Sequence, residues 1–239
     1  MRNFYLVLVV CFLVALLIGF ESKSAFTIQK PAIPTIQPVV EIGDISLAVP
    51  AVDKDGNGTL AELRIRMMAG TGKTFFSMDE GAPYLNPETQ ASFRMAMKVA
   101  GDFSGIAIAD RDFYFSIQGP SDVVGGRSAG AAASVAIISL LKKDSLRNDT
   151  IITGNVDETG KIGRVGQIWE KFKAVKAAEY FRFIIPEGEA VVELPPEECQ
   201  KNPTAICKPE RETFDLRALG SIQVIEVKNI AEAYKEMSQ

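Results

Sequence analysis

The stretch from Ser128 to Leu141 is apolar on almost every side when it is drawn as a helix. A helix without a polar face cannot lie on a surface, so other elements must surround it. The sequence therefore predicts a helix that runs through the centre of a layered domain. Strands and helices are mixed on both sides of it without strict alternation, which favours an α+β fold.

The other elements follow from apolar periodicity and from turn residues. Asn86, Pro87 and Glu88 form a typical helix start, and the apolar residues from Phe93 to Phe103 continue it with helical spacing. Strands are expected at 45–52, 59–68, 112–118, 181–186 and 221–227, helices at 169–180 and 230–237, and a hairpin of 150–156 with 161–165 about a turn at 157–160.

Ser128 stands between Gly126 and Gly130, a spacing typical of a hydrolase nucleophile on a sharp turn. The chain contains no histidine, so an activating base must be a lysine, a carboxylate or a terminal amine. The dipole and N–H groups of the helix that follows would stabilise an oxyanion at this position. The alternative is that Ser128 is only a helix cap.

Three lysines on one predicted helix are candidates for the base: Lys171, Lys173 and Lys176. A lysine has a pKa near about 10.4, and burial lowers it by disfavouring the charged amine. Residue type alone does not choose among the three, and a solvated helix face is the other interpretation.

Ordered motifs decide between them: Gly126-x-Ser128-Ala129-Gly130, then Thr153-Gly154, then the segment Gly160–Lys171. This pattern, from about Ile45 onward, resembles the proteolytic domain of the Lon protease family, most closely its short archaeal members. In that family the nucleophilic serine and the base lysine are 43 positions apart, as Ser128 and Lys171 are here. The resemblance implies that Thr153 helps to hold the lysine amine.

The implied function is a serine endopeptidase with a Ser-Lys dyad that cleaves unfolded or exposed peptide segments. The sequence shows no valid phosphate loop, so we expect hydrolysis without ATP and without any cofactor. Because Lon-like domains commonly form rings, a homo-oligomer is expected too, although no residue demonstrates one.

The sequence departs from the family pattern just before the serine. The family usually has Asp-Gly-Pro where this chain has Gly125, Gly126 and Arg127. The added charge of Arg127 would either favour a neutral Lys171 by repulsion or obstruct the site. These changes support an alternative function: a catalytically impaired Lon-like domain that acts as a membrane-tethered binding or assembly module.

Two segments imitate other binding sites. Residues 53–58 resemble the start of a calcium loop, but Arg64 stands where a bidentate glutamate is needed. Residues 70–74 resemble the end of a phosphate loop, but Met67 occupies the place of its first glycine. We expect both to be turns between strands, and we expect no metal site.

The N-terminus predicts export. Residues 4–20 carry no charge and follow Arg2. Their length lies between that of a signal-peptide core and a short membrane helix, and a buried core helix is the remaining alternative. The predicted organisation is a signal peptide or membrane anchor at 1–24, a Pro-rich linker at 25–41 and the peptidase domain at 42–239. The domain would then be extracytoplasmic at the cell membrane, or secreted.

Charge and cysteine content add two expectations. The net charge of −4 gives no electrostatic reason to expect nucleic-acid binding. Outside the cytoplasm, Cys199 and Cys207 would either close a short loop as a disulfide or remain two free thiols.

Overall fold

The computed structural model describes residues 40–76, 84–119, 123–194, 211–220 and 222–239. The chain divides into two units, Met1–Pro38 and Val39–Gln239, and the second is described below. The predicted N-terminal hydrophobic helix, most of the linker and both Cys199 and Cys207 lie outside the described residues. Within the described part of the chain, no helix combines the length and apolarity that crossing a membrane requires.

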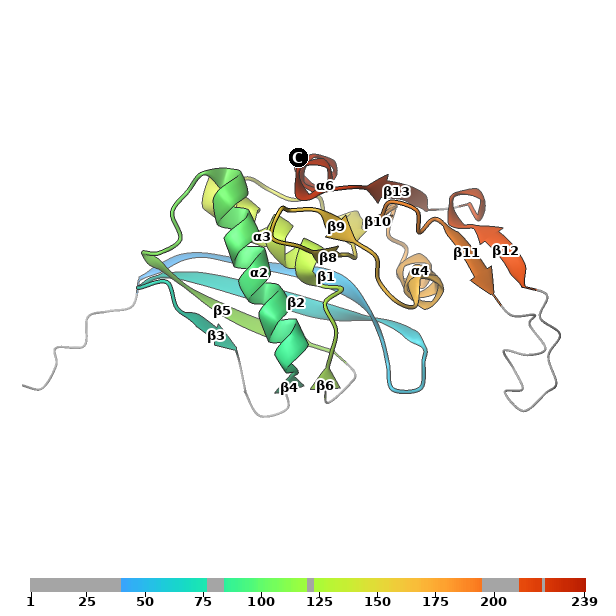
Figure 1. The fold of residues 1–239 in the computed structure, drawn as a ribbon, viewed down its shortest axis with the longest axis horizontal. Coiled ribbons are helices and arrows are strands. Elements are labelled where there is room, and N and C mark those ends of the chain that lie inside the picture. The colour runs from blue at the N-terminus through green and yellow to red at the C-terminus, as the bar shows by residue number, and fades with distance from the viewer. Residues whose placement is uncertain (1–39, 77–83, 120–122, 195–210, 221) are drawn as a thin grey trace, which may run out of the picture. The chain divides into compact units, whose positions relative to one another are not determined.

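A four-stranded sheet forms one layer of the domain (Figure 1). The predicted hairpin about residues 53–58 and the predicted strand at 112–118 are confirmed, and they supply three of its four strands. Alternate residues such as Leu63, Ile65, Phe113 and Phe115 are fully buried, as strands with one covered face require. The strands, in spatial order, are β1 (Glu41–Val52), β2 (Gly58–Ala69), β5 (Arg111–Gln118) and β3 (Thr74–Phe76), and only the β5–β3 pair is parallel.

Helix α2 (Pro87–Ser104) begins as predicted: the side chain of Asn86 caps it by accepting the N–H of Thr89. Phe93 anchors the helix on the sheet, with its ring centroid 4.9 Å from that of Phe115. Phe103 was expected on the buried face, but it is 38% exposed because it lies at the last turn, against the edge of another ring.

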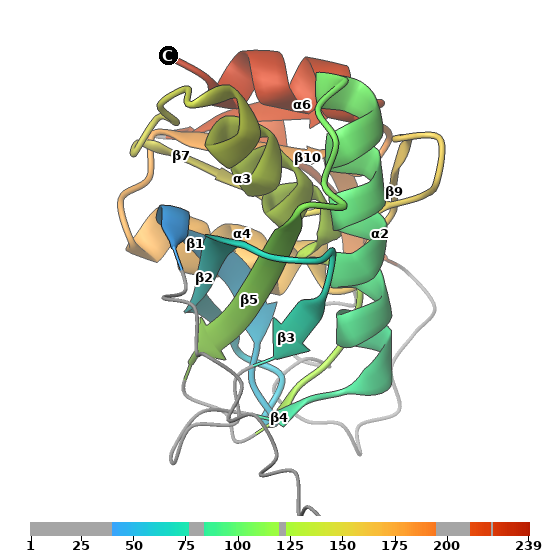
Figure 2. The ribbon, with the colours of Figure 1, turned by 90° about the vertical axis from the view of Figure 1, so that its left-hand side faces the viewer.

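Helix α3 (Gly130–Lys142) is the predicted central helix, and eleven of its thirteen residues are buried. It contacts α2, the four-stranded sheet and a second, smaller sheet (Figures 1 and 2). The helix starts two residues later than predicted, with Ala129 at its N-cap, so Ser128 lies in the turn before it.

The second sheet is fully parallel, in the order β13 (Gln223–Val227), β10 (Arg182–Pro186), β7 (Thr150–Ile152). Helix α4 (Ile168–Ala177) connects β7 to β10, and α6 (Ile230–Met237) is the closing helix at its predicted bounds. The remaining elements are β4 (Tyr84–Leu85), β6 (Val123–Val124), β8 (Asn155–Val156), β9 (Ile162–Gly163), β11 (Val191–Leu194), β12 (Glu212–Asp215) and a 3-10 turn, Leu216–Ala218.

The predicted hairpin of 150–156 with 161–165 was only partly right. Antiparallel pairing is confined to β8 and β9, whereas β7 joins the parallel sheet. The chain breaks its strand at Gly154, which lies against α3: a Cβ there would be 3.2 Å from that of Ala131 and 2.6 Å from Ile162. Tertiary packing of α3 therefore ends the strand early.

Gly58 provides a test of how α4 is seated on the sheet. A Cβ at this position would overlap the carbonyl oxygen of Glu170, so Gly58→Ala must push β2 and α4 apart. We expect the free energy of unfolding to fall by about 1–3 kcal/mol in denaturant titrations. Gly166→Ala is the matched control because its Cβ would meet nothing within 4 Å. Equal stability of the two variants would show that α4 is not held in this way.

Candidate active site

Ser128 occupies a half-buried turn between β6 and α3. The N-cap of α3 is Ala129, and no side chain makes a capping hydrogen bond there. The structure therefore does not support a capping role for Ser128, and its hydroxyl has no part in starting the helix.

The first turns of α2 hold one side of this turn. The hydroxyl of Thr89 donates to the carbonyl of Gly126 at 2.9 Å, and that of Ser92 donates to the carbonyl of Arg127 at 3.2 Å. Gly130 permits this close approach, because a Cβ on it would lie 2.7 Å from the Ser92 hydroxyl. Gly130 thus allows the start of α3 to pack closely against α2.

Thr153 and Gly154 hold the other side. The Ser128 carbonyl accepts the N–H of Gly154 at 2.9 Å and the hydroxyl of Thr153 at 3.2 Å. Thr153 is fully buried. The resemblance implies that this threonine helps to hold the lysine amine; in the structure its hydroxyl is bonded to the main chain of the serine. Thr153 therefore fixes the backbone position of Ser128.

The start of α3 contributes its dipole to the site more than its free N–H groups. The N–H of Gly130 already donates to Arg127 at 3.0 Å, and that of Ala131 donates to Gly154 at 3.0 Å. A positive helix terminus still lies directly behind Ser128, where it favours negative charge.

Of the three candidate lysines on α4, Lys171 is buried, at 5% exposure, whereas Lys173 and Lys176 are exposed. Burial lowers the pKa of Lys171 to about 8, and the nearby carboxylate of Glu189 acts in the opposite direction. Tertiary structure thus selects the lysine at the spacing of 43, and its amine loses a proton far more readily than a solvated lysine does.

Ser128 and Lys171 line the same cavity, which has a volume of about 130 Å³. One wall is the β1–β2 hairpin, and another is the turn before α3. Gln167, at the N-cap of α4 with a positive φ of 57°, also lines it. The hairpin contributes Val49–Val52, Thr59 and Ala61 to the lining, the turn contributes Gly125, Gly126 and Ala129, and Thr89, Ile117 and Gly119 complete it.

Comparison with known proteins finds a family match for the segment that contains Ser128 and Lys171. Residues 117–209 match the model of the Lon protease (S16) C-terminal proteolytic domain. Residues 117–209, which include Ser128 and Lys171, are therefore similar to the proteolytic domain of the Lon family. The archaeal Lon protease of Methanocaldococcus jannaschii is 34% identical over 86 residues, which are 36% of this chain and 13% of that protein. The Lon protease of Fervidobacterium nodosum is 25% identical over 141 residues, 59% of this chain and 17% of that protein. The chain thus spans less than a fifth of these relatives.

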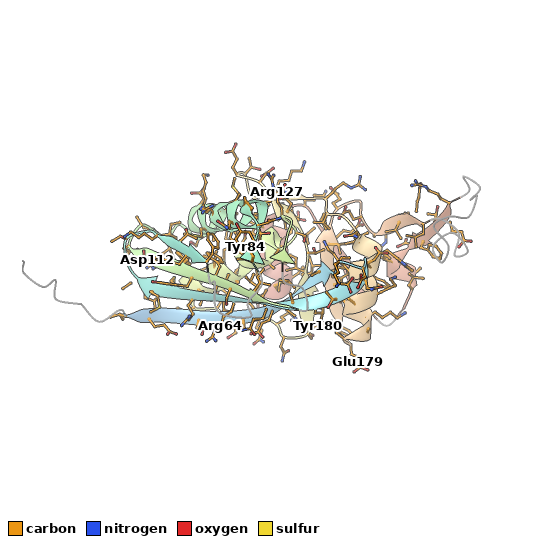
Figure 3. The ribbon with its side chains drawn as sticks, turned by 90° about the horizontal axis from the view of Figure 1, so that it is seen from below. Arg64, Tyr84, Asp112, Arg127, Glu179 and Tyr180 are labelled. Atoms are coloured by element: carbon orange, nitrogen blue, oxygen red, sulfur yellow. The ribbon has the colours of Figure 1, made fainter. Side chains whose placement is uncertain are left out.

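The two departures from the Lon pattern now have places in the fold. Arg127 is exposed on the helix side of the domain, and it is not among the residues that line the cavity (Figure 3). Arg127 therefore does not obstruct the cavity. Burial and the charge of Glu189, and not Arg127, account for the shifted pKa of Lys171. At Gly125, a Cβ would be 2.8 Å from the side-chain amide of Asn86, which occupies the space beside the turn.

Glu189 is the residue that sequence analysis missed. It is 5% exposed, and burial raises the pKa of its carboxyl, against the opposing effects of Val165 N–H, Arg164 and Lys171. Nothing in the sequence separates it from Glu187, which is two positions earlier and exposed. The burial of Glu189 depends on how β10 and the turn after it pack in the fold.

The two imitation motifs are turns, as predicted. The carboxylate of Asp53 accepts N–H groups of its own hairpin turn, at Asp55 and Asn57. The carboxylate of Asp112 accepts the N–H groups of Thr71 and Lys73, where a phosphate loop would bind an anion. Among the described residues, no group of three or more acidic, cysteine or histidine side chains could hold a metal ion.

The burial of Lys171 predicts an unusual titration. With lysines labelled at Cε, the NMR resonance that disappears in Lys171→Arg should titrate with a midpoint near 8. A midpoint near the usual value of about 10.5 would mean that the amine reaches water.

Thr153→Val tests the support of the serine backbone. Loss of one hydrogen bond to the Ser128 carbonyl should lower the free energy of unfolding by about 1 kcal/mol. The amide resonance of Gly154, which shares that acceptor, should also shift. Thr150→Val is the control, because it breaks a bond to Asp149 and should leave the Gly154 resonance in place. Identical Gly154 resonances in both variants would show that the Thr153 hydroxyl does not support the Ser128 backbone.

Proposed function

We propose that this domain is a serine endopeptidase in which Ser128 is the nucleophile and Lys171 is the general base. The observation that carries the proposal is a buried lysine, with its pKa lowered to about 8, lining the same small cavity as the serine. The match of residues 117–209 to the Lon proteolytic domain and the absence of histidine from the chain support it.

The chemistry follows from a neutral amine beside a hydroxyl. Lys171 Nζ takes the proton of Ser128 as Oγ attacks the carbonyl carbon of a peptide bond. The resulting ammonium returns that proton to the leaving amine, and the acyl group stays on Oγ as an ester. A water molecule, deprotonated by the same amine, then attacks the ester carbonyl, and the ammonium returns that proton to Oγ as the C–Oγ bond breaks, which releases the carboxylic acid and restores the serine. The dipole of α3 favours the oxyanion formed in both steps.

The lowered pKa decides how much active base is present. At pH 7, a pKa of about 8 leaves about a tenth of the amine neutral, whereas a solvated lysine would be neutral in only about one molecule in 3000. Burial therefore raises the population of competent base about 300-fold near neutrality.

We further propose that the substrates are unfolded or exposed peptide segments and that cleavage proceeds without ATP. The cavity is small and partly lined by apolar residues such as Val49 and Ile117, which suits a single side chain of an extended chain. The loop at residues 70–74 already binds a carboxylate through its N–H groups, which supports independence from nucleotide. Export and membrane attachment by the N-terminal segment, homo-oligomer formation and the lack of nucleic-acid binding belong to the same proposal.

The alternative of a binding module without catalysis was suggested by Gly125 and Arg127. Arg127 does not line the cavity, and Gly125 lines it without a side chain, which supports the catalytic proposal. The alternative would return if a correctly folded chain cleaved none of a broad set of peptides.

Ser128→Ala and Lys171→Met test the dyad. With unstructured casein or a fluorogenic peptide as substrate, each should lower kcat/KM by about three orders of magnitude or more, because either loss removes the whole unit. Lys173→Met is the control: it removes an exposed amine from the same helix and should retain activity. Equal rates for Lys171→Met and wild type would exclude Lys171 as the base.

The pH dependence gives a second test. The base is competent when it has lost its proton, so kcat/KM should rise with pH and level off above a midpoint near 8. A flat profile from about pH 6 to 10 would contradict a lysine base.

A further inference from the structure

Glu189 lies in the turn between β10 and β11 with its carboxylate directed inward. Its two oxygens are 3.1 and 3.2 Å from the main-chain nitrogen of Val165, and one of them is 3.5 Å from Nε of Arg164. The carboxylate is thus buried, and within the described ranges its hydrogen-bond and ion-pair partners are one main-chain N–H, that of Val165, and one largely exposed guanidinium, that of Arg164. A buried charge with so few partners needs a reason.

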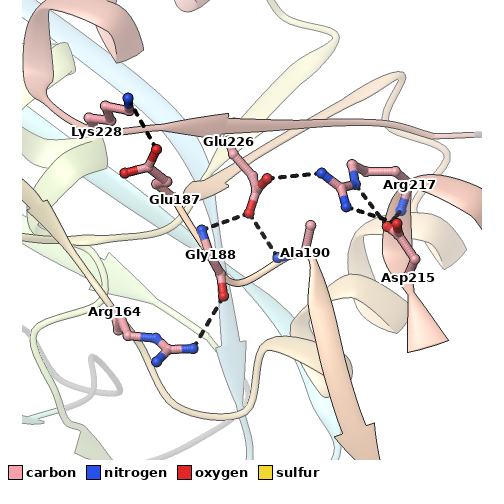
Figure 4. Close-up of polar contacts among 8 residues, drawn as sticks. All are labelled: Arg164, Glu187, Gly188, Ala190, Asp215, Arg217, Glu226 and Lys228. Carbon is pink, nitrogen blue, oxygen red and sulfur yellow. Dashed lines mark hydrogen bonds and ion pairs between the residues drawn. The ribbon is translucent and has the colours of Figure 1, made fainter. Parts of the chain in front are cut away.

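A polar network fixes the main chain on both sides of Glu189 (Figure 4). The N–H groups of Gly188 and Ala190 both donate to Glu226, at 2.7 and 3.1 Å. The carbonyl of Gly188 accepts Nη2 of Arg164 at 3.2 Å. The turn is therefore held at three main-chain groups, and the carboxylate of Glu189 is locked in its inward direction.

The N–H that Glu189 accepts belongs to the segment that leads into α4. Val165 lies two residues before Gln167, the N-cap of α4, whose carbonyl accepts the N–H of Lys171 at 3.1 Å. The Glu189 carboxylate therefore acts on Lys171 in two ways: through its hydrogen bond to the main chain at Val165 and through its charge. Among the described residues, the charges of Arg164 and Lys171 lower the pKa of the Glu189 carboxyl. The charge of Glu189 in turn raises the pKa of Lys171.

We propose that Glu189 is a positioning residue for Lys171, anchoring the segment before α4 and serving as the buried counter-charge of the lysine amine. The inference rests on the proposed function for its catalytic meaning, but the charge coupling is a property of the folded domain itself. Arg164 is 75% exposed, so water screens its charge, whereas Glu189 and Lys171 are each only 5% exposed.

This arrangement sets a compromise between two requirements. Burial alone would drive the amine to a still lower pKa, and the negative charge of Glu189 raises it again. The carboxylate therefore keeps the conjugate acid of Lys171 available to protonate the leaving amine, at the expense of some neutral base.

Glu189→Gln separates charge from anchoring, because its amide oxygen still accepts the N–H of Val165. In the Cε-labelled chain, the midpoint of Lys171 should move to lower pH by about half a unit or more. If the chain is a peptidase, the pH profile of kcat/KM should move in the same direction. Glu187→Gln is the matched control: it removes an exposed charge from the same turn, paired with Lys228 at 3.2 Å, and should leave both midpoints unchanged.

The titration decides this inference independently of activity. An unchanged Lys171 midpoint in Glu189→Gln would overturn the proposal, whether or not the chain cleaves peptides. If the midpoint shifts in Glu189→Gln but the wild-type chain cleaves no peptide, the coupling is upheld and the proposed function is rejected. Should Glu189→Gln fail to fold, Lys171→Met gives the reciprocal measurement, since coupling is mutual. The carboxyl of Glu189 should then titrate at higher pH than in wild type, and no change would overturn the inference.

Discussion

The site depends on keeping the amine of Lys171 away from water. Because burial lowers the pKa of this amine from 10.5 to about 8, keeping it charged lowers the free energy of unfolding by about 3 kcal/mol below pH 8. This cost fades as the pH rises towards 10.5. The pKa stays low only if the surroundings do not relax and admit water to the amine. The close approach of Gly58 to the backbone of α4 and the anchored turn around Glu189 limit such relaxation.

The two halves of the site come from different layers. Ser128 belongs to the turn before α3, the helix enclosed by both sheets, and Lys171 belongs to α4, the connection between two strands of the parallel sheet. The turn at Ser128 is tied by hydroxyls of α2 on one side and by Thr153 and Gly154 on the other. The serine is therefore positioned by long-range packing around a buried helix, and this is the reason that the glycines at 130 and 154 cannot carry side chains without displacing their neighbours.

Much of this could be predicted from local pattern. The helix start at Asn86, the alternation of Phe113 and Phe115 and the turn at residues 53–58 have short-range causes, and the structure agrees with them. Predictions failed where a distant segment decided the outcome. The strand after Thr150 ends early because α3 lies against Gly154, and the hydroxyl of Thr153 is bonded to a carbonyl that sequence reasoning had not considered.

The sequence by itself determined that the base must be something other than histidine, that a central helix follows Ser128 and that Lys171 stands 43 positions further on. Residue identities and spacing are enough for these conclusions. Tertiary structure decided which lysine is buried, that Arg127 lies outside the cavity and that Glu189, not Glu187, faces inward. Burial and electrostatic coupling arise between segments far apart in the chain, so no local pattern in the sequence encodes them.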